Sequence, residues 1–377
     1  MKSVIGLGFG DEGKGLTTNF LSKKHNISLI IRHSGGHQAG HNVVFNNKNH
    51  IFSNFGSGSF QNIPTYWSNY CTVDPIGLVN EFKILLNFGL NPIIYIDANS
   101  PITTPFEKIK NTCSINNLKH GTCGVGFGAT FEREDNFYSL VFSDIYNEWI
   151  LKEKIENIKK YYYNNISIDD DYIYDFYESI NYIILHNENF RLTYGIPDKF
   201  KTNDNILFEG SQGLLLDQHF GFFPHVTRTN TGTKNILNIL NNNNINNYNI
   251  DYYLITRAYQ TRHGNGPMSN KNIDIDINNT NETNVTNKYQ GDFKKSILDV
   301  SLLEYGINKD INLKNSKNKN LVITCLDHIT EYVFTYNNKL IICDNENDFI
   351  NKISNILNIH NVYISKSNIS ENILKYK

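Results

Sequence analysis

The chain has 377 residues, of which 40% are hydrophobic and 13% aromatic, so it is long enough to bury a sizeable core and is not intrinsically disordered. Its net charge of -2 excludes the strong positive field of proteins that bind nucleic acid or an anionic membrane surface. The five cysteines are scattered without C-x-x-C spacing, which predicts neither a disulfide framework nor a zinc site. An anionic ligand must therefore be held by local groups.

The first residues lead directly into a short apolar run, without the charged and apolar regions of a secretory signal. No later segment approaches the ~18 consecutive apolar residues that a membrane span needs. We therefore expect a soluble cytoplasmic protein with no membrane and no nucleic-acid partner.

Short apolar runs bounded by turn residues recur along the chain and predict strands that are covered on both faces. They are residues 3–8, 27–33, 91–98, 205–210, 252–259, 321–327, 339–344 and 361–367. Segments with helical spacing lie between several of them, for example residues 74–89, where Leu78, Phe82 and Leu85 recur on one face and Gly89 offers a stop. This alternation predicts an α/β fold with a mainly parallel central sheet flanked by helices.

We expect the whole chain, residues 1–377, to form a single domain. Two asparagine-rich tracts, residues 241–249 and 271–288, are predicted to be surface excursions, because neither has the Pro, Gly or Ser content of a linker. In parallel α/β sheets, ligands bind beyond the carboxyl ends of the strands. The polar motifs of this sequence fall at those positions.

The first motif is GLGFGDEGKG, residues 6–15, between the first predicted strand and a helical segment. Its glycines and Lys14 fit the G-x-x-x-x-G-K frame of a phosphate-binding loop. Gly15, however, stands where a magnesium-holding Ser or Thr is usual, and Asp11 and Glu12 bring negative charge into a turn suited to anions. The loop is predicted to bind phosphate and to use its carboxylates for a second task.

The second motif, RHSGGHQAGHN at residues 32–42, follows the next predicted strand. Its glycines permit close approach of a ligand, and His41 can donate to a phosphate oxygen. The alternative is a glycine-rich loop with solvated histidines, whereas a helical metal-binding pair is opposed by the glycines. Polar loops rich in Gly, Thr and Gln recur at residues 120–134, 208–233 and 257–268.

Taken in order, these motifs resemble those of the adenylosuccinate synthetase family, from Gly6 to nearly the C-terminus. GDEGKG and GGHQAGHN resemble its two signature loops, GDEGKGK and GGHNAGHT, and GSG at residues 56–58 resembles its PSG turn. FEGSQGLLLD and FPHVT (residues 208–227) resemble FEGAQGTLLD and YPYVT, and AYQTRHGNGP and the late Ile-Ser pair continue the series. The resemblance implies a P-loop-like GTP-binding fold with long ligand-binding loops.

That family joins L-aspartate to C6 of IMP, with GTP as co-substrate and Mg²⁺, through a 6-phosphoryl intermediate in the AMP branch of purine biosynthesis. The resemblance implies that Asp11 removes the N1 proton of the base and that His41 stabilises the transferred phosphoryl group. It implies one magnesium ion, held by Asp11 and the Gly40 carbonyl, and a homodimer.

The resemblance also implies binding residues, position by position. Those for the nucleotide phosphates are Gly10, Glu12, Gly13, Lys14, Gly15, Gly40, His41 and Asn42. Those for IMP are Gln38, Thr122, Cys123, Gln212 and Thr227. Asp327 and Ser365 fall on the positions that bind guanine.

Two departures from the family pattern affect phosphate binding. In GTCGVGFGA, residues 121–129, Cys123 replaces a threonine and Val125 an arginine, so that a phosphate partner is lost. The arginine that enters from the partner subunit aligns to Phe137, and Arg133 is the nearest candidate to replace it.

Two further departures affect the other substrates. The arginine-rich aspartate loop is replaced by YQGDFKKSILD, which leaves Lys294 and Lys295 as the candidate aspartate-binding cations. Lysine gives up the bidentate recognition of a carboxylate that arginine provides. TCLD at residues 324–327 lacks the lysine that covers the base, so ATP is an alternative to GTP.

The same changes are similar to a shorter phage branch that joins aspartate to dGMP to form 2-aminoadenylosuccinate. The retained Asp11 favours IMP, whereas the altered loops favour dGMP. A hypothesis from a different class is a P-loop nucleotide switch or kinase, against which the missing Ser or Thr after Lys14 speaks. A non-catalytic homologue would be expected to have lost Asp11 or His41, and both are present.

Overall fold

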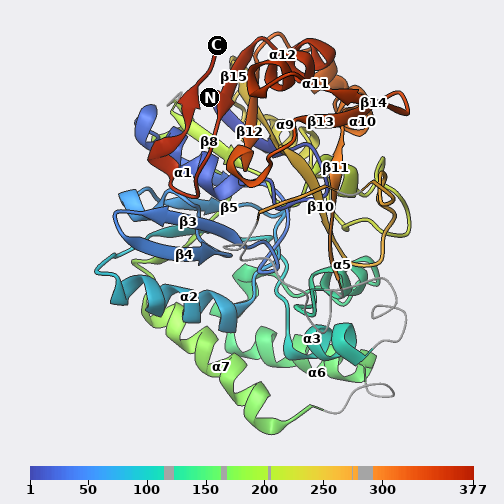
Figure 1. Ribbon diagram of the computed structural model, residues 1–377. Coiled ribbons are helices and arrows are strands. Elements are labelled where there is room, and N and C mark those ends of the chain that lie inside the picture. The colour runs from blue at the N-terminus through green and yellow to red at the C-terminus, as the bar shows by residue number, and fades with distance from the viewer. Residues whose placement is uncertain (114–122, 163–167, 203–204, 274, 279–291) are drawn as a thin grey trace.

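The computed structural model describes residues 1–113, 123–162, 168–202, 205–273, 275–278 and 292–377 (Figure 1). The strands are β1 (Lys2–Gly6), β2 (Leu29–Arg32), β3 (His41–Phe45), β4 (Lys48–Phe52), β5 (Thr65–Trp67), β6 (Ile94–Asp97), β7 (Phe190–Thr193), β8 (Ile206–Glu209), β9 (Asp251–Arg257), β10 (Tyr259–His263), β11 (Phe293–Asp299), β12 (Lys319–Thr324), β13 (Val333–Tyr336), β14 (Lys339–Ile342), β15 (Asn361–Ile364) and β16 (Leu374–Lys375). The helices are α1 (Lys14–Lys24), α2 (Pro75–Asn87), α3 (Pro105–Cys113), α5 (Phe127–Asp135), α6 (Glu148–Tyr162), α7 (Asp170–Leu185), α8 (Asp198–Lys201), α9 (Lys234–Asn242), α10 (Val300–Lys309), α11 (Ile311–Asn315) and α12 (Glu346–Leu357). Short 3₁₀ turns are η1 (Ser59–Gln61), η2 (Phe142–Tyr146), η3 (Leu214–Leu216), η4 (Leu326–His328) and η5 (Ser370–Asn372).

A ten-stranded sheet runs through the middle of the molecule, in the order β16-β15-β12-β9-β1-β8-β2-β5-β6-β7. Each neighbouring pair in this sheet is parallel except β15 and β16. Helices flank the sheet, with α2, α6 and α7 toward one end and α10 and α12 toward the other (Figure 1). The predicted α/β fold with a mainly parallel sheet is confirmed.

Most of the predicted strands belong to this sheet. The runs at residues 3–8, 27–33, 91–98, 205–210, 252–259, 321–327 and 361–367 contain β1, β2, β6, β8, β9, β12 and β15. The run at residues 339–344 was predicted wrongly to be covered on both faces. It forms β14, antiparallel to β13 in a separate four-stranded sheet, and Leu340 and Ile342 are 51% and 71% exposed. Apolar letters in so short a run do not distinguish an edge hairpin from a central strand.

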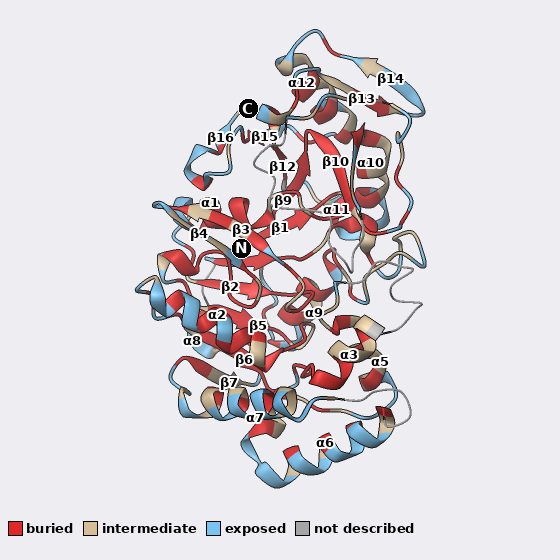
Figure 2. Cartoon of the chain, turned by 60° about the horizontal axis from the view of Figure 1, so that its bottom comes forward, coloured by how far each residue is buried: buried red, intermediate tan, exposed pale blue. Residues whose placement is uncertain are grey.

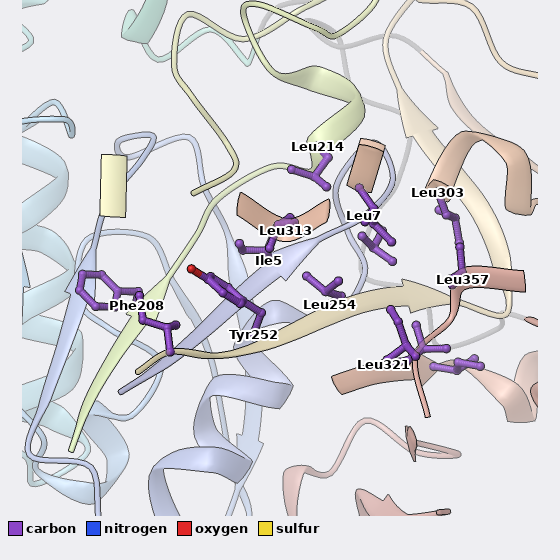
Figure 3. Packing of buried hydrophobic residues seen from close by; sticks show 14 of the residues in the cluster. Ile5, Leu7, Phe208, Leu214, Tyr252, Leu254, Leu303, Leu313, Leu321 and Leu357 are labelled. Atoms are coloured by element: carbon purple, nitrogen blue, oxygen red, sulfur yellow. The ribbon is translucent and has the colours of Figure 1, made fainter. Parts of the chain in front are cut away.

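The central strands are buried on both faces, as the colouring of Figure 2 shows, whereas α6 and α7 present exposed outer surfaces. Ile5, Phe208, Leu254 and Leu321 pack together within the main apolar cluster (Figure 3). Such a core fixes the strands relative to one another because close-packed interiors leave little room for adjustment. The loops at the strand ends are therefore carried on a rigid base.

The predicted helix at residues 74–89 is α2, and Gly89 follows it with a left-handed φ of 77°. Leu78, Phe82 and Leu85 are buried in a second cluster, where the Phe82 and Phe190 rings lie 4.8 Å apart. The helix ends where its sequence indicated because glycine accepts the left-handed conformation at little cost.

Residues 241–249 comprise the end of α9 and the loop after it, and they are mostly exposed, although Asn243 and Ile245 are buried. The second asparagine-rich tract, residues 271–288, lies largely outside the described residues. Cys71 and Cys343 are free thiols. Among the described helices, none is long and apolar enough to cross a membrane.

Strands β1, β2, β8, β9 and β12 run parallel, so their carboxyl ends meet at one edge of the sheet. The loops that follow them are the motifs singled out in the sequence. The hairpin of β3 and β4 and the N-terminus of α1 pack against each other beside this edge. Segments far apart in the sequence are thereby brought to one place.

Candidate functional site

A cleft of about 1050 Å³ opens at this edge of the sheet, large enough for nucleotide-sized ligands. The predicted site residues that line it are Gly10, Asp11, Gly13, Lys14, Gly15, Gln38, Gly40, His41, Asn42, Cys123, Gln212, Thr227 and Asp327. Thr122 lies outside the described residues. The motifs thus contribute to a single cavity, although they were identified independently along the chain.

The carboxylate of Glu12, one of the two in the first loop, bonds to groups of the loop itself. It is buried, and its Oε1 accepts hydrogen bonds from the backbone N–H groups of Gly8 (3.0 Å) and Gly10 (2.8 Å). Its Oε2 accepts from Lys14 Nζ at 2.7 Å. The resemblance assigned Glu12 to the phosphates, but it is not among the described residues that line the cleft. Its carboxylate instead satisfies the loop's own donors and holds Lys14 in place.

Gly15 occupies the position where a P-loop usually has Ser or Thr. A Cβ atom at Gly15 would lie 2.8 Å from His41 Cβ and 3.1 Å from the carbonyl oxygen of Asn42. The first turn of α1 therefore approaches β3 too closely for any side chain. The departure from the P-loop pattern follows from this packing.

His41 is held by a buried carboxylate. Its Nδ1 lies 2.7 Å from Glu209 Oε1, and Glu209 also accepts hydrogen bonds from the hydroxyl and the N–H (3.0 Å) of Ser57. His41 Nε2 is buried and has no hydrogen-bond partner within the described part of the chain. Because His41 lines the cleft, this nitrogen is the atom left for a ligand.

Burial lowers the pKa of His41 to about 4, although the nearby Glu209 carboxylate opposes this shift. Burial opposes the ionisation of Glu209, but His41, Arg32 and the Ser57 hydroxyl together lower its pKa to about 2. Glu209 is therefore ionised at neutral pH. The imidazole is neutral and is placed to donate its Nδ1–H to Glu209.

Asp11 projects from a strained turn at the mouth of the cleft. Its φ of 63° is left-handed, and its Oδ2 lies 3.3 Å from His263 Nε2. Arg257 Nε donates to the Asp11 carbonyl oxygen at 2.5 Å, which fixes the backbone of this turn. Burial opposes ionisation of Asp11, but the hydrogen bond from His263 and the charges of His263, Arg257 and Lys14 lower its pKa. Asp11 is therefore ionised and able to accept a proton.

His263 and Arg257 also line the cleft, and sequence reasoning gave them no role. Arg257 ends β9 and His263 ends β10, and both belong to the polar stretch at residues 257–268. Their position after a parallel strand was the available signal, but nothing in the sequence indicated that they would contact Asp11.

The two predicted guanine-binding positions differ in their surroundings. Asp327 lies in η4, lines the cleft and is partly exposed. Ser365 is fully buried, and its hydroxyl donates to the carbonyl oxygen of Ser367 at 2.8 Å. Residues 366–368, which follow it, line the cleft instead.

Lys294 and Lys295 are not among the described residues that line the cleft. Lys294 Nζ donates to the Gly266 carbonyl oxygen at 3.1 Å, and burial, with the charges of Lys271 and Arg262, lowers the pKa of Lys294. The cleft contains other cations, which are Lys14, Arg228, Arg257, Arg262 and Lys366. The cations that line the cleft thus differ from the two that the sequence indicated.

Arg262 is buried, and burial lowers its pKa to about 10. It donates to the carbonyl oxygens of Pro267 (2.7 Å) and His225 (3.1 Å), and its guanidinium lies 4.2 Å from the centroid of the Phe9 ring. These contacts join three of the cleft-lining loops. Arg262 therefore acts in the structure as a tie between them.

The expectation that Arg133 replaces the partner subunit's arginine is wrong. Arg133 is fully buried and pairs with Glu107 at 2.8 Å and Glu134 at 2.7 Å. Two further N–H groups of Arg133 donate to the carbonyl oxygens of Ile102 and Tyr138. A guanidinium so committed to its own subunit cannot extend into another one.

Within the described residues, no group of three or more His, Cys, Asp and Glu side chains is placed to hold a metal ion. Magnesium does not require such a cage, because it is usually bound by one or two carboxylates together with water and substrate phosphates. The ionised Asp11 and the backbone of Gly40 line the same cleft and fit this mode of binding.

The structure is a mainly parallel α/β sheet whose strand β1 leads into a glycine-rich loop, and this loop opens into a polar cleft at the carboxyl ends of the strands. A sequence model described as adenylosuccinate synthetase matches residues 3–336. The chain belongs to the adenylosuccinate synthetase family.

Similar proteins agree with this assignment. Adenylosuccinate synthetases of Blochmanniella pennsylvanica (strain BPEN) and Buchnera aphidicola subsp. Schizaphis graminum (strain Sg) are 30% and 32% identical to this chain over 285 and 298 residues. The matches cover 70% and 72% of this chain but 63% and 65% of those relatives. The chain thus spans slightly less than two thirds of their length.

Two solved structures share the fold. A fully ligated adenylosuccinate synthetase from Plasmodium falciparum superposes with a TM-score of 0.73 and 18% identity, covering 100% of this chain and 99% of that one. The succinoaminodeoxyadenylate synthetase of cyanophage S-2L, bound to dGMP and dATP, gives a TM-score of 0.65 and 13% identity over 99% of this chain and 94% of that one.

Proposed function

We propose that the protein is a ligase that joins L-aspartate to C6 of IMP, driven by GTP hydrolysis, through a 6-phosphoryl intermediate. The observation that carries this proposal is the meeting of Asp11, Lys14 and His41 in one cleft. Each of these side chains is held by another residue, namely His263, Glu12 and Glu209. A proton acceptor, a phosphate-binding cation and an imidazole with an open nitrogen are the groups that such a reaction needs.

Asp11 has the role of base. As the ionised form it accepts the N1 proton of hypoxanthine, and the charge passes to O6 of the purine. O6 then attacks the γ-phosphorus of GTP, so that the O6–P bond forms while the bond between the γ-phosphorus and the bridging oxygen breaks and GDP leaves. The amine of aspartate attacks C6 in the second step and loses a proton, and phosphate leaves from C6.

Lys14 and His41 act on the phosphoryl group. Lys14 is fixed by Glu12 beside the loop amides, where it can neutralise charge on the nucleotide phosphates. A phosphate anion near His41 favours the protonated imidazole, which then donates from Nε2 while Nδ1–H remains bonded to Glu209. Magnesium bound by Asp11 and the Gly40 carbonyl would neutralise charge on the transferring phosphate.

We further propose that the enzyme works as a homodimer in the cytoplasm and that Gln38, Gln212 and Thr227 contact IMP. Asp327, which is partly exposed in the cleft, is proposed to accept from the N–H groups of guanine and so to favour GTP. Aspartate is proposed to bind among the cleft-lining cations Arg257, Arg262 and Lys366.

The test is an end-point assay of the purified chain with Mg²⁺, aspartate, either IMP or dGMP, and either GTP or ATP. We expect an aspartate-dependent change in purine absorbance together with released phosphate, highest with IMP and GTP. Product from dGMP but not from IMP would keep the ligase chemistry and overturn the substrate. Nucleotide hydrolysis without an aspartate-dependent product would overturn the ligase and favour a nucleotide switch.

A further inference from the structure

The described cleft residues at the positions that the resemblance gives to IMP and its phosphate are uncharged. They are Gln38, Cys123, Val125, Gln212 and Thr227. A phosphate monoester carries about two negative charges at neutral pH and binds most strongly to charge-assisted donors. The expected arginine positions do not supply them, because Val125 is apolar and Arg133 is buried in its own ion pairs.

The amide of Gln38 marks this part of the cleft. Its oxygen and nitrogen are both buried and have no hydrogen-bond partner within the described part of the chain. The oxygen lies 3.0 Å from the Cβ position of Gly36, which in turn lies 3.1 Å from the Phe127 ring. Buried amide atoms without hydrogen bonds destabilise the folded protein, so we expect a polar ligand to form hydrogen bonds with them.

Arg228 lines the same cleft and comes from the loop after β8. It follows Thr227, lines the cleft, and lies against Gly128, the neighbour of Phe127, with its Cδ 3.8 Å from the Cβ position of Gly128. Its Nη1 donates to the Gly128 carbonyl oxygen at 3.5 Å, the limit of a hydrogen bond.

No carboxylate among the described residues lies within ion-pair distance of Arg228. Glu132, the acidic residue of α5 in the cleft, pairs with Lys110 at 2.9 Å. Arg228 is exposed, and among the described residues its guanidinium is not paired with an acid.

We propose that Arg228 is the cation that binds the phosphate of the nucleoside monophosphate, and that this chain supplies it from the same subunit. The inference rests on the proposed function and adds a residue to which neither the sequence motifs nor the comparisons give a role. The planar guanidinium offers paired donors to two phosphate oxygens, while Thr227 and Gln38 contribute neutral hydrogen bonds.

The experiment compares IMP with inosine, which has the same base and ribose but no phosphate, by isothermal titration calorimetry of the full chain. We expect Arg228→Met to weaken the binding of IMP by about 10- to 100-fold, the effect of losing a charged hydrogen bond, and to leave that of inosine unchanged. Arg228→Lys should retain part of the preference for IMP. Arg191→Met removes an arginine outside the cleft and serves as the matched control.

The outcomes separate the two proposals. If the wild type prefers IMP to inosine and Arg228→Met retains that preference in full, the assignment of Arg228 is overturned and the ligase proposal stands. If the wild type binds dGMP in place of IMP, the same comparison is made with dGMP and deoxyguanosine. If the wild type binds neither nucleotide, the proposed function fails, and the assignment of Arg228 fails with it.

Discussion

Glu209 determines the direction in which His41 can act, because its carboxylate occupies the Nδ1 side of the ring. Glu209→Gln should lower kcat by roughly 10²–10⁴-fold, the range that acid–base groups contribute, with KM for IMP little changed. Steady-state kinetics would measure both constants. Glu81→Gln is the control, since Glu81 is also a buried carboxylate, bonded to the N–H of Asn54 at 2.7 Å, but lies outside the cleft-lining set. An equal loss of kcat in Glu209→Gln and Glu81→Gln would show that Glu209 has only a structural role.

His33 makes the stability of the protein sensitive to acid. It is fully buried next to Phe208, and burial lowers its pKa from 6.5 to about 3. His33 therefore takes up a proton near pH 6.5 in the unfolded chain but only near pH 3 in the folded chain. Because protonation favours the unfolded chain between these values, the free energy of unfolding falls as the pH drops below 6.5. Between pH 8 and pH 5 this contribution is about 2 kcal/mol.

Removing His33 should therefore flatten the dependence of stability on pH. The free energy of unfolding, measured in urea, should fall by about 2 kcal/mol less between pH 8 and pH 5 in His33→Leu than in the wild type. His360→Leu, at an exposed position, controls for the loss of a histidine. Identical pH dependence in the wild type and His33→Leu would show that His33 does not remain neutral in the folded state.

At the scale of the secondary-structure elements, helix α1 packs so closely against strand β3 that no side chain fits at Gly15. Gly15→Thr, which restores the usual P-loop letter, should lower the free energy of unfolding by about 1–3 kcal/mol through overpacking and should also displace His41. Thermal unfolding and the ligase assay would show the two effects. Gly89→Asn is the control, because a Cβ there meets nothing within 4 Å and asparagine tolerates its left-handed φ. Unchanged stability in Gly15→Thr would contradict the packing argument.

The elements that could be predicted from sequence are those whose patterns are local. The strands before the motif loops are continuous apolar runs, and Gly89 ends α2 through its own conformational freedom. β5, with three residues, and β7, with polar letters among four, are too short to give a pattern, and their neighbours in the sheet determine them.

The same distinction holds in the cleft. The glycine and lysine spacing of the first loop is local, so its place in the cleft could be predicted. The pairing of His41 with Glu209 joins residues 168 positions apart, and Asp11 meets His263 only because β1 and β9 are neighbours. Contacts of this kind are set by the sheet order and leave no signal in either segment alone.

At the scale of the whole molecule, the segment from the end of α5 to the first turn of α6 carries four exposed aromatic side chains, which are Phe137, Tyr138, Tyr146 and Trp149. Phe137 is 94% exposed and holds a left-handed φ of 68°, which is unfavourable for a bulky residue. Phe137 also occupies the position at which the resemblance expects a contact with the partner subunit. We therefore propose that this segment lies in the homodimer interface.

Phe137→Ser should weaken self-association by at least roughly 10-fold, as expected for an aromatic anchor, without changing the fold. Sedimentation equilibrium would measure the dimer dissociation constant. Tyr194→Ser, which removes another exposed aromatic residue, from the loop after β7, should have no effect. A wild-type chain that stays monomeric at every accessible concentration would contradict the dimer.

The internal bonds of Glu12 have a consequence for how quickly nucleotide is captured. Because its carboxylate already satisfies the Gly8 and Gly10 amides and anchors Lys14, the loop is ordered before any ligand arrives. The conformational entropy of the loop is lost when the protein folds, so binding of the nucleotide does not lower it further. Association should then be governed by diffusion and by electrostatic attraction to the cleft, with no slow phase for assembling the loop.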